Sequence, residues 1–322
     1  MPTNAGEIEI FILTYNRAEM LRHAIESCIR QSLKGVSITV LDSGSTDHTA
    51  EVIASFDYEK LKFYPSSENI GAYANIKRCQ KICTKKFVMI FHDDDLLHPN
   101  YLEEAFHLLK QNPDANIAVS NSTNKSFGSP ENCTIKINSL ALKLSKLDFA
   151  NILYVRNKIA FSSAIYRKER LLSIDFDSMR INYERWADRP ILIEVTGEGT
   201  AIFLTQPYVQ SGRHKGQDSK NRDTLPKAIV WLNREKFFKN ILGDNLTDLS
   251  GLSFCIMNYR RIKSGFKRRI NQEVSFSEYI DNAIAVGALT KKTWLLGWFA
   301  IGPIKWLINT YSKFVFKRRF RI

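Results

Sequence analysis

Short apolar runs alternate with longer amphipathic segments along the first third of the chain. The apolar runs have the length and composition of strands, and they span Ile8–Leu13, Val36–Leu41 and Phe87–Phe91. A further brief strand is predicted at Lys62–Tyr64. The segments between them repeat apolar residues at helical spacing, which predicts helices at Ala18–Gln31, from Thr46 or Asp47 to Phe56, and at Gly71–Cys83. Because such repeats with short connections form parallel sheets covered by helices, we predict an α/β fold with a mostly parallel, Rossmann-like sheet.

The pattern changes in the last third of the chain, where helical spacing replaces the alternation. Helices are predicted at Leu225–Leu242 and Gly251–Ile270. We therefore divide the chain into an α/β domain, residues 1–218, and a helical, basic C-terminal region, residues 219–322.

The C-terminal region ends in an amphipathic stretch that holds three of the chain's five tryptophans. Thr293–Ile304 is an uncharged run of 12 residues, which is too short for a membrane-spanning helix of about 20 residues. The apolar residues from Ile304 to Val315 then fall on one helical face. These features predict a segment, about 290–322, that lies in the interface of an anionic membrane. A helix docked on the α/β domain is the alternative.

Charge is concentrated at the same end of the chain. The net charge is +13, and Cys255–Ile322 contains 14 Lys and Arg against 3 Asp and Glu, an excess of 11. An anionic membrane surface is the partner that we expect for this region. The five cysteines are scattered, and the first residues lack a secretory signal, so we expect a cytoplasmic protein, peripheral on the inner face of the cell membrane. Cys79 and Cys83 lack the second pair of ligands that a zinc site needs.

Polar residues gather where the predicted strands end. Thr14–Arg17 follows the first strand, Asp42–Ser45 the second, and Asp93–Asp95 the fourth. In parallel sheets, ligands bind at the carboxyl ends of the strands, so these three loops are expected to converge on one crevice. For Asp42–Asp47, a turn followed by a helix cap is the alternative.

The sequence Asp93-Asp94-Asp95 places three carboxylates directly after a buried strand. Such carboxylates repel one another, and a bound cation is the simplest compensation. Oxygen ligands favour Mn²⁺ or Mg²⁺. The alternative is a cap for a helix at Pro99–Lys110.

Four ordered motifs carry a family resemblance: IFILTYNRAEMLRHAIESCIRQSL, TVLDSGSTDHTAEVI, SENIGAYAN and FVMIFHDDDLLHPNYLEEA. Together, over roughly residues 7–215, they resemble a family 2 glycosyltransferase of GT-A fold, of the bacterial surface-polysaccharide type. The resemblance implies metal-dependent, inverting transfer of a sugar from a nucleoside-diphosphate donor to a saccharide acceptor, lipid-linked in this type. UDP-sugars are favoured as donors, although dTDP- and GDP-sugars are also used in the family.

The resemblance also assigns roles to individual residues. It implies that Asp93, Asp95 and His214 bind the metal and that Asp188 is the catalytic base, with Glu184 as the fallback. The residues implied in nucleotide-sugar binding are Thr14, Tyr15, Arg17, Asp42, Asn69, Asp93, Asp94 and His214. Arg213 or Lys215 would neutralise phosphate charge. The chain departs from the family pattern at Ser43 and Ala187, where many members carry an acid, and for Asp188 a helix cap is the alternative.

Two other classes of function remain to be compared. A metal-dependent phosphohydrolase or nucleotidyltransferase could use the same acids, but it leaves Tyr15 and Asp42 unexplained. A nucleic-acid binder would explain the basic tail, yet three carboxylates in the crevice oppose a phosphate backbone. We therefore expect no nucleic-acid partner.

Overall fold

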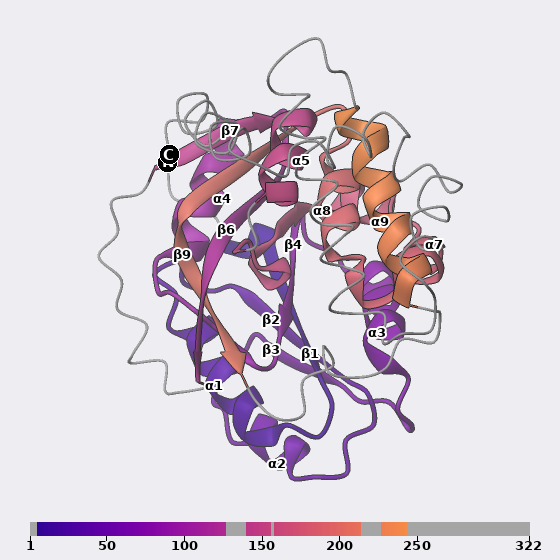
Figure 1. Cartoon of the computed structure of the whole chain (residues 1–322). Helices are drawn as coiled ribbons and strands as arrows, with labels where there is room; N and C mark the ends of the chain where they lie inside the picture. The colour runs from indigo at the N-terminus through magenta and orange to yellow at the C-terminus, as the bar shows by residue number, and fades with distance from the viewer. Residues whose placement is uncertain (1–4, 127–139, 156–157, 214–226, 244–322) are drawn as a thin grey trace. The chain divides into compact units, whose positions relative to one another are not determined.

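The computed structural model describes residues 5–126, 140–155, 158–213 and 227–243 (Figure 1). The chain divides into two compact units, Met1–Arg180 with Ile191–Asn221 and Ile181–Pro190 with Arg222–Ile322. The predicted domain boundary after residue 218 lies outside the described residues and stays a prediction.

Four parallel strands form the first half of the sheet, in the order β3-β2-β1-β4. Their bounds are β1 Ile8–Thr14, β2 Ser37–Asp42, β3 Leu61–Tyr64 and β4 Phe87–His92. In this register Thr14 lies opposite Asp42, and Leu13 lies opposite His92. The loops that follow β1, β2 and β4 therefore begin at the same edge of the sheet, as the sequence predicted.

The second half of the sheet is mixed and continues in the order β8-β6-β9-β5. Its strands are β5 Asp95–Leu97, β6 Ala115–Ser126, β7 Ala141–Ser145, β8 Ile165–Arg167 and β9 Thr200–Arg213. Strand β8 is antiparallel to both β4 and β6, while β9 runs parallel to β6 and antiparallel to β5 and β7. The long strand β9 thus reaches β5, which begins at Asp95 in the predicted site.

Helices cover both faces of the parallel strands. Ile8, Ile10 and Ile12 of β1 pack in one core cluster with residues of α1 (Ala18–Ile29) and α4 (Tyr101–Gln111). Phe11 is also fully buried, and successive side chains of a strand point to opposite faces. Helix α3 (Gly71–Ile82) contacts β1 and β2. Burial on both faces explains why β1, β2 and β4 read as nearly continuous apolar runs.

Shorter elements complete the described chain. In the first unit they are η1 Ala5–Glu7, α2 Thr49–Ala54, α5 Lys146–Val155, η3 Phe161–Ser163 and α6 Lys168–Leu172. Further along are α7 Phe176–Tyr183, η4 Glu184–Trp186, α8 Asp188–Thr196 and α9 Lys227–Leu242. Helix α9 agrees with the predicted helix at this place, and within the second unit it packs its Phe237 ring against Tyr183. The predicted helix at Gly251–Ile270 and the membrane-interface segment lie outside the described residues.

Among the residues that the structure describes, no helix has both the length and the apolar character needed to cross a membrane.

Candidate functional site

The loops after β1 and β2 are locked together by side-chain hydrogen bonds to backbone amides. Asn16, at φ 51°, donates its backbone N–H to Ser45 Oγ at 2.8 Å and accepts the Thr46 N–H at 2.7 Å through its Oδ1 atom. Asp47 accepts the N–H of Ala18, the first residue of α1, at 3.0 Å. These bonds join the start of α1 to the second loop, so the loops form one rigid rim.

Asp42 also holds the loop after β2 in place. Its carboxylate is buried, accepting the Ser45 N–H at 3.0 Å and the Ser45 hydroxyl at 2.5 Å. These bonds form the turn that the alternative interpretation of this loop predicted. Oxygen atoms with two lone pairs retain further acceptor capacity, so the predicted contact of Asp42 with a nucleotide base stays a prediction.

Asp93 joins the end of β4 to the loop after β1. Only 1% of the residue is exposed, and its Oδ2 atom accepts the Thr14 hydroxyl at 2.8 Å while Oδ1 pairs with Arg17 Nη1 at 2.9 Å. Burial raises the pKa of Asp93, and the Arg17 guanidinium opposes that shift. The structure therefore brings together three of the predicted site residues, Thr14, Arg17 and Asp93.

Asp95 is fixed from the other half of the sheet. It accepts the hydroxyl of Ser162, in η3, and the backbone N–H of Gly212, in β9, at 3.1 Å. Burial raises the pKa of Asp95 to about 6, an effect that the nearby His92 opposes. Two oxygens of a buried carboxylate are thus oriented by neutral donors, and neither bond neutralises the charge.

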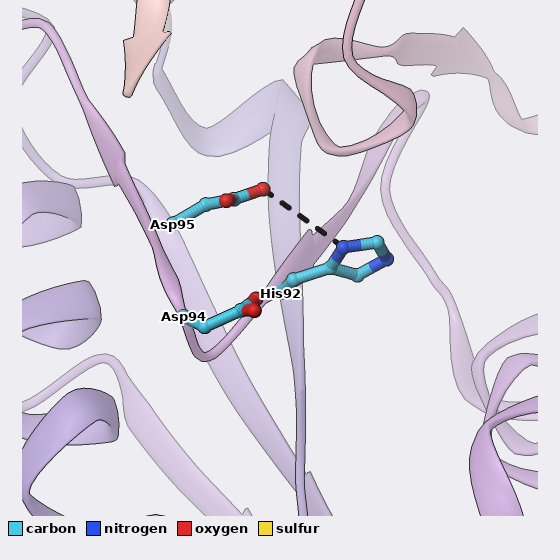
Figure 2. Close-up of side chains that lie close together, drawn as sticks. All are labelled: His92, Asp94 and Asp95. Carbon is cyan, nitrogen blue, oxygen red and sulfur yellow. Dashed lines mark ion pairs between the residues drawn. The ribbon is translucent and has the colours of Figure 1, made fainter. Parts of the chain in front are cut away.

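His92, Asp94 and Asp95 form a cluster that could hold a cation (Figure 2). One ligand atom from each residue lies within 4.8 Å of the other two, and His92 Nδ1 is 3.8 Å from Asp95 Oδ2. Figure 2 shows the imidazole and the Asp95 carboxylate directed toward each other, with Asp94 on the turn between them. Two ligands of an octahedral ion at about 2.1 Å lie about 3–4 Å apart, so this donor set fits Mn²⁺ or Mg²⁺ after small adjustments.

The other predicted residues are placed as follows. Tyr15 is 40% exposed at the end of β1. Asn69 is exposed, and its Oδ1 atom accepts the Gly71 N–H at 3.0 Å in the turn that starts α3. Asp188 is exposed at the first position of α8, and Glu184 has a positive φ of 44°. Both acids belong to the second unit, so their role as catalytic base stays a prediction.

Three remaining predictions concern the loop that follows β9. Arg213 is the last residue of that strand, while His214 and Lys215 lie outside the described residues. The proposed metal contact of His214 therefore stays a prediction. Cys79, in α3, and Cys83, directly after that helix, do not belong to a group of metal-ligating side chains among the described residues.

The alternative of a helix cap for the triple aspartate does not describe Asp93 or Asp95. Helix α4 begins at Tyr101, after Asn100, and the carboxylates of Asp93 and Asp95 bond to other elements.

Sequence reasoning missed three contributors to this site: His92, Ser162 and the Gly212 amide. His92 directly precedes the three aspartates, so its position was a usable signal. Ser162 and Gly212 lie 67 and 117 residues from Asp95 along the chain. Only the pairing of β5 with β9 and the place of η3 bring them near, and neither leaves a local pattern.

The chain is similar in sequence to known glycosyltransferases. The chain is similar to an uncharacterized glycosyltransferase of Rickettsia typhi, with 29% identity over 112 residues, 35% of each chain. The match therefore spans about a third of that relative's length. An uncharacterized glycosyltransferase of Haemophilus influenzae is 25% identical over 240 residues, 72% of this chain and 90% of the relative.

Solved structures show the same fold at low sequence identity. S. aureus TarS 1–349 in complex with UDP-GlcNAc aligns with a TM-score of 0.60 and 16% identity, over 90% of this chain and 83% of TarS 1–349. The mannosyltransferase PcManGT from Pyrobaculum calidifontis, in complex with GDP-Man and Mn²⁺, aligns with a TM-score of 0.51 and 14% identity, over 98% of this chain and 82% of its own. The predicted GT-A fold is confirmed.

The model of the family described as "Glycosyl transferase family 2" matches residues 9–172, about half of the chain. This span contains β1 to β4, the interlocked rim and the His92–Asp94–Asp95 cluster. The chain belongs to glycosyl transferase family 2.

Proposed function

We propose that this protein is a metal-dependent, inverting glycosyltransferase that moves a sugar from a nucleoside-diphosphate donor, with UDP favoured, to a saccharide acceptor. One observation carries the proposal. The buried Asp93 ties the base-side loop, through Thr14 and Arg17, to the turn that carries the cation-ligating cluster. A single donor molecule could therefore place its nucleoside at the rim and its diphosphate at the cluster.

The base side of the donor would meet the rim after β1 and β2. Tyr15 offers an exposed aromatic ring, which can stack on a nucleotide base, and Asp42 offers a carboxylate held in place by Ser45. These two residues are also what a phosphohydrolase would leave without a role. The complexes of TarS with UDP-GlcNAc and of PcManGT with GDP-Man support a nucleotide-sugar donor.

The diphosphate side would meet His92, Asp94 and Asp95. A divalent cation at these ligands, when bound, supplies positive charge that offsets the charge developing on the leaving diphosphate. Asp95 is oriented for this role before any ligand binds, because Ser162 and Gly212 fix both of its oxygens. The Mn²⁺ in the PcManGT complex supports a divalent cation here.

Asp188 would act as the base on the acceptor. In a single displacement, the acceptor oxygen attacks the anomeric carbon from the face opposite the diphosphate, the bond from that carbon to the phosphate oxygen breaks, and Asp188 takes the acceptor's proton. An exposed carboxylate at the start of α8 is accessible to an acceptor from solvent.

The basic C-terminal region bears on where the reaction takes place. Its excess of 11 positive charges and its tryptophans suit a surface of anionic lipid. We therefore propose a lipid-linked saccharide acceptor, a role in cell-surface polysaccharide assembly, and a position on the cytoplasmic face of the membrane.

A thermal-shift screen of nucleoside diphosphates, with and without Mn²⁺, would identify the nucleotide of the donor. A ligand at a hundred times its dissociation constant adds about 2.7 kcal/mol to the free energy of unfolding, which a thermal shift detects. We expect UDP with Mn²⁺ to stabilise the protein, and Asp95→Asn to abolish the metal-dependent part. Sugar release from a UDP-sugar panel that does not increase when a saccharide acceptor is added would instead indicate a hydrolase.

Replacement of the proposed base separates catalysis from capping. Asn caps a helix about as well as Asp, so Asp188→Asn should keep the melting temperature and the UDP affinity of the wild type. Turnover should fall by about 10²- to 10⁴-fold, the contribution of a general base. Glu184→Gln is the matched variant. Normal turnover in Asp188→Asn together with an inactive Glu184→Gln would move the role of the base to Glu184.

A further inference from the structure

We propose that His92 is a direct metal ligand and that its imidazole makes the site select Mn²⁺ over Mg²⁺. The inference rests on the proposed function, since it concerns the cation of the same site. It starts from the contact between His92 and Asp95, which has the distance of an ion pair and not that of a hydrogen bond. His92 Nδ1 lies 3.8 Å from Asp95 Oδ2, which is beyond hydrogen-bond range but within the spacing of two ligands around one ion.

The Asp95 oxygen that faces His92 is already satisfied by another donor. Oδ2 accepts the Ser162 hydroxyl, and Oδ1 accepts the Gly212 N–H. Asp95 therefore does not depend on His92 for orientation. The two side chains lie close together with a gap between their polar atoms, and Asp94 offers a third ligand atom to the same place.

One short turn orients both residues. In η3, Phe161 stacks on the His92 ring, with centroids 6.0 Å apart and planes inclined by 22°. The next residue, Ser162, holds Asp95. The His92 side chain is still 41% exposed, so a cation can reach it from solvent. Ligands that are oriented by neighbouring side chains in this way are typical of metal sites.

The chemistry of imidazole explains the selectivity. Mg²⁺ prefers oxygen ligands and keeps several waters, whereas nitrogen ligands favour transition metals. Two carboxylates alone would bind either ion. A third ligand that is a nitrogen atom shifts the preference toward Mn²⁺.

The variant His92→Phe tests this directly, because phenylalanine keeps an aromatic ring against Phe161 and removes both ring nitrogens. His107, exposed on α4, provides the matched control His107→Phe. Pulsed electron paramagnetic resonance of bound Mn²⁺ detects the hyperfine coupling of a directly bound nitrogen. Because His214 is also a predicted nitrogen ligand, the spectra are recorded in the His214→Ala background. We expect the coupling in His214→Ala alone and with His107→Phe, with or without UDP, and its loss when His92→Phe is added.

Calorimetry then measures the preference. The ratio of Mn²⁺ to Mg²⁺ affinity should fall about tenfold or more in His92→Phe. Removing a residue that only supports a metal ligand already lowers metal affinity by about 10- to 100-fold, and His92 is proposed to be a ligand itself. Ser162→Ala should weaken both ions together and leave the ratio unchanged. A nitrogen coupling that persists when His92→Phe is combined with His214→Ala, or an unchanged ratio, would overturn the proposal and leave the proposed function standing. If neither ion bound to the wild type, with or without UDP, and UDP bound alone, the metal dependence of the proposed function would fail as well.

Discussion

Two equally exposed tyrosines lie at the carboxyl edge of the sheet, one after β1 and one at the end of β3. Tyr15 follows β1 and Tyr64 ends β3, and each is 40% exposed. Stacking of a base on an aromatic side chain contributes about 1–3 kcal/mol, so Tyr15→Ala should weaken UDP binding by that amount. Tyr64→Ala should leave it unchanged. Calorimetry with UDP and Mn²⁺ compares the two, and an equal loss in both variants would place the base elsewhere.

The buried Asp95 should make the free energy of unfolding decrease as the pH rises, the opposite of what a carboxylate with a lowered pKa does. Burial raises the pKa of Asp95 to about 6 from its ordinary 3.8. Between these values the folded protein binds more protons than the unfolded chain, so this residue's contribution to the unfolding free energy falls as pH rises. From about pH 5 to about pH 7.5 the wild type should lose about 1.4 kcal/mol relative to Asp95→Asn.

Urea unfolding in the presence of a metal chelator measures that difference at each pH. A pH-independent effect of the substitution on stability cancels when the values at different pH are compared. Asp114, at the surface, is the control. Its pKa is lowered by a hydrogen bond from Lys143, so stability from this pair is lost only in more acidic solution, below its ordinary value. Asp114→Asn should therefore show a flat difference over the same range. If the difference between the wild type and Asp95→Asn did not change with pH, the pKa of the Asp95 carboxyl would not be raised.

At the scale of elements, the sequence predicts those with a local pattern of apolar residues. It does not predict those that form only by pairing with distant segments. The strands β1 to β4 and the helices between them were predicted within a few residues. The main strands are short apolar runs, and the helices repeat apolar residues at helical spacing. The convergence of their loops then followed from parallel pairing. The mixed half of the sheet was not predicted, since β8 has only three residues and β5 begins directly after the acidic turn. Ser162 and Gly212 depend on that half for their contact with Asp95.

The rim after β2 depends on one glycine. Gly44 has a φ of +74°, and an added Cβ atom would lie 2.7 Å from the backbone carbon of Glu68. Gly71 has a φ of +75° with nothing within 4 Å, which makes it a matched control. Alanine at φ > 0 costs about 1–2 kcal/mol. Gly71→Ala should lose only this amount in urea unfolding, while Gly44→Ala should lose more and also bind UDP more weakly. Equal losses would mean that the loop before α3 yields freely.

At the scale of the whole molecule, charge and chemistry lie in different parts of the sequence. The family match ends at residue 172, and 11 of the 13 net positive charges follow residue 254. The basic residues of the predicted membrane segment can therefore be replaced without replacing a residue of the site. Each basic residue near an anionic surface contributes about 1 kcal/mol.

Replacing four basic residues in either part tests the attachment without shortening the chain. Replacing Lys313, Lys317, Arg318 and Arg319 by Gln should weaken binding to anionic vesicles by up to about 4 kcal/mol. The control replaces four exposed lysines of the first unit, Lys34, Lys62, Lys81 and Lys86, which changes the net charge equally. Vesicle flotation, with and without anionic lipid, measures the difference. High salt should weaken wild-type binding only in part, because apolar contact is insensitive to ionic strength. Transfer to a soluble acceptor should stay the same in both variants. Equal flotation of both variants would show that net charge, not this segment, attracts the protein to the membrane.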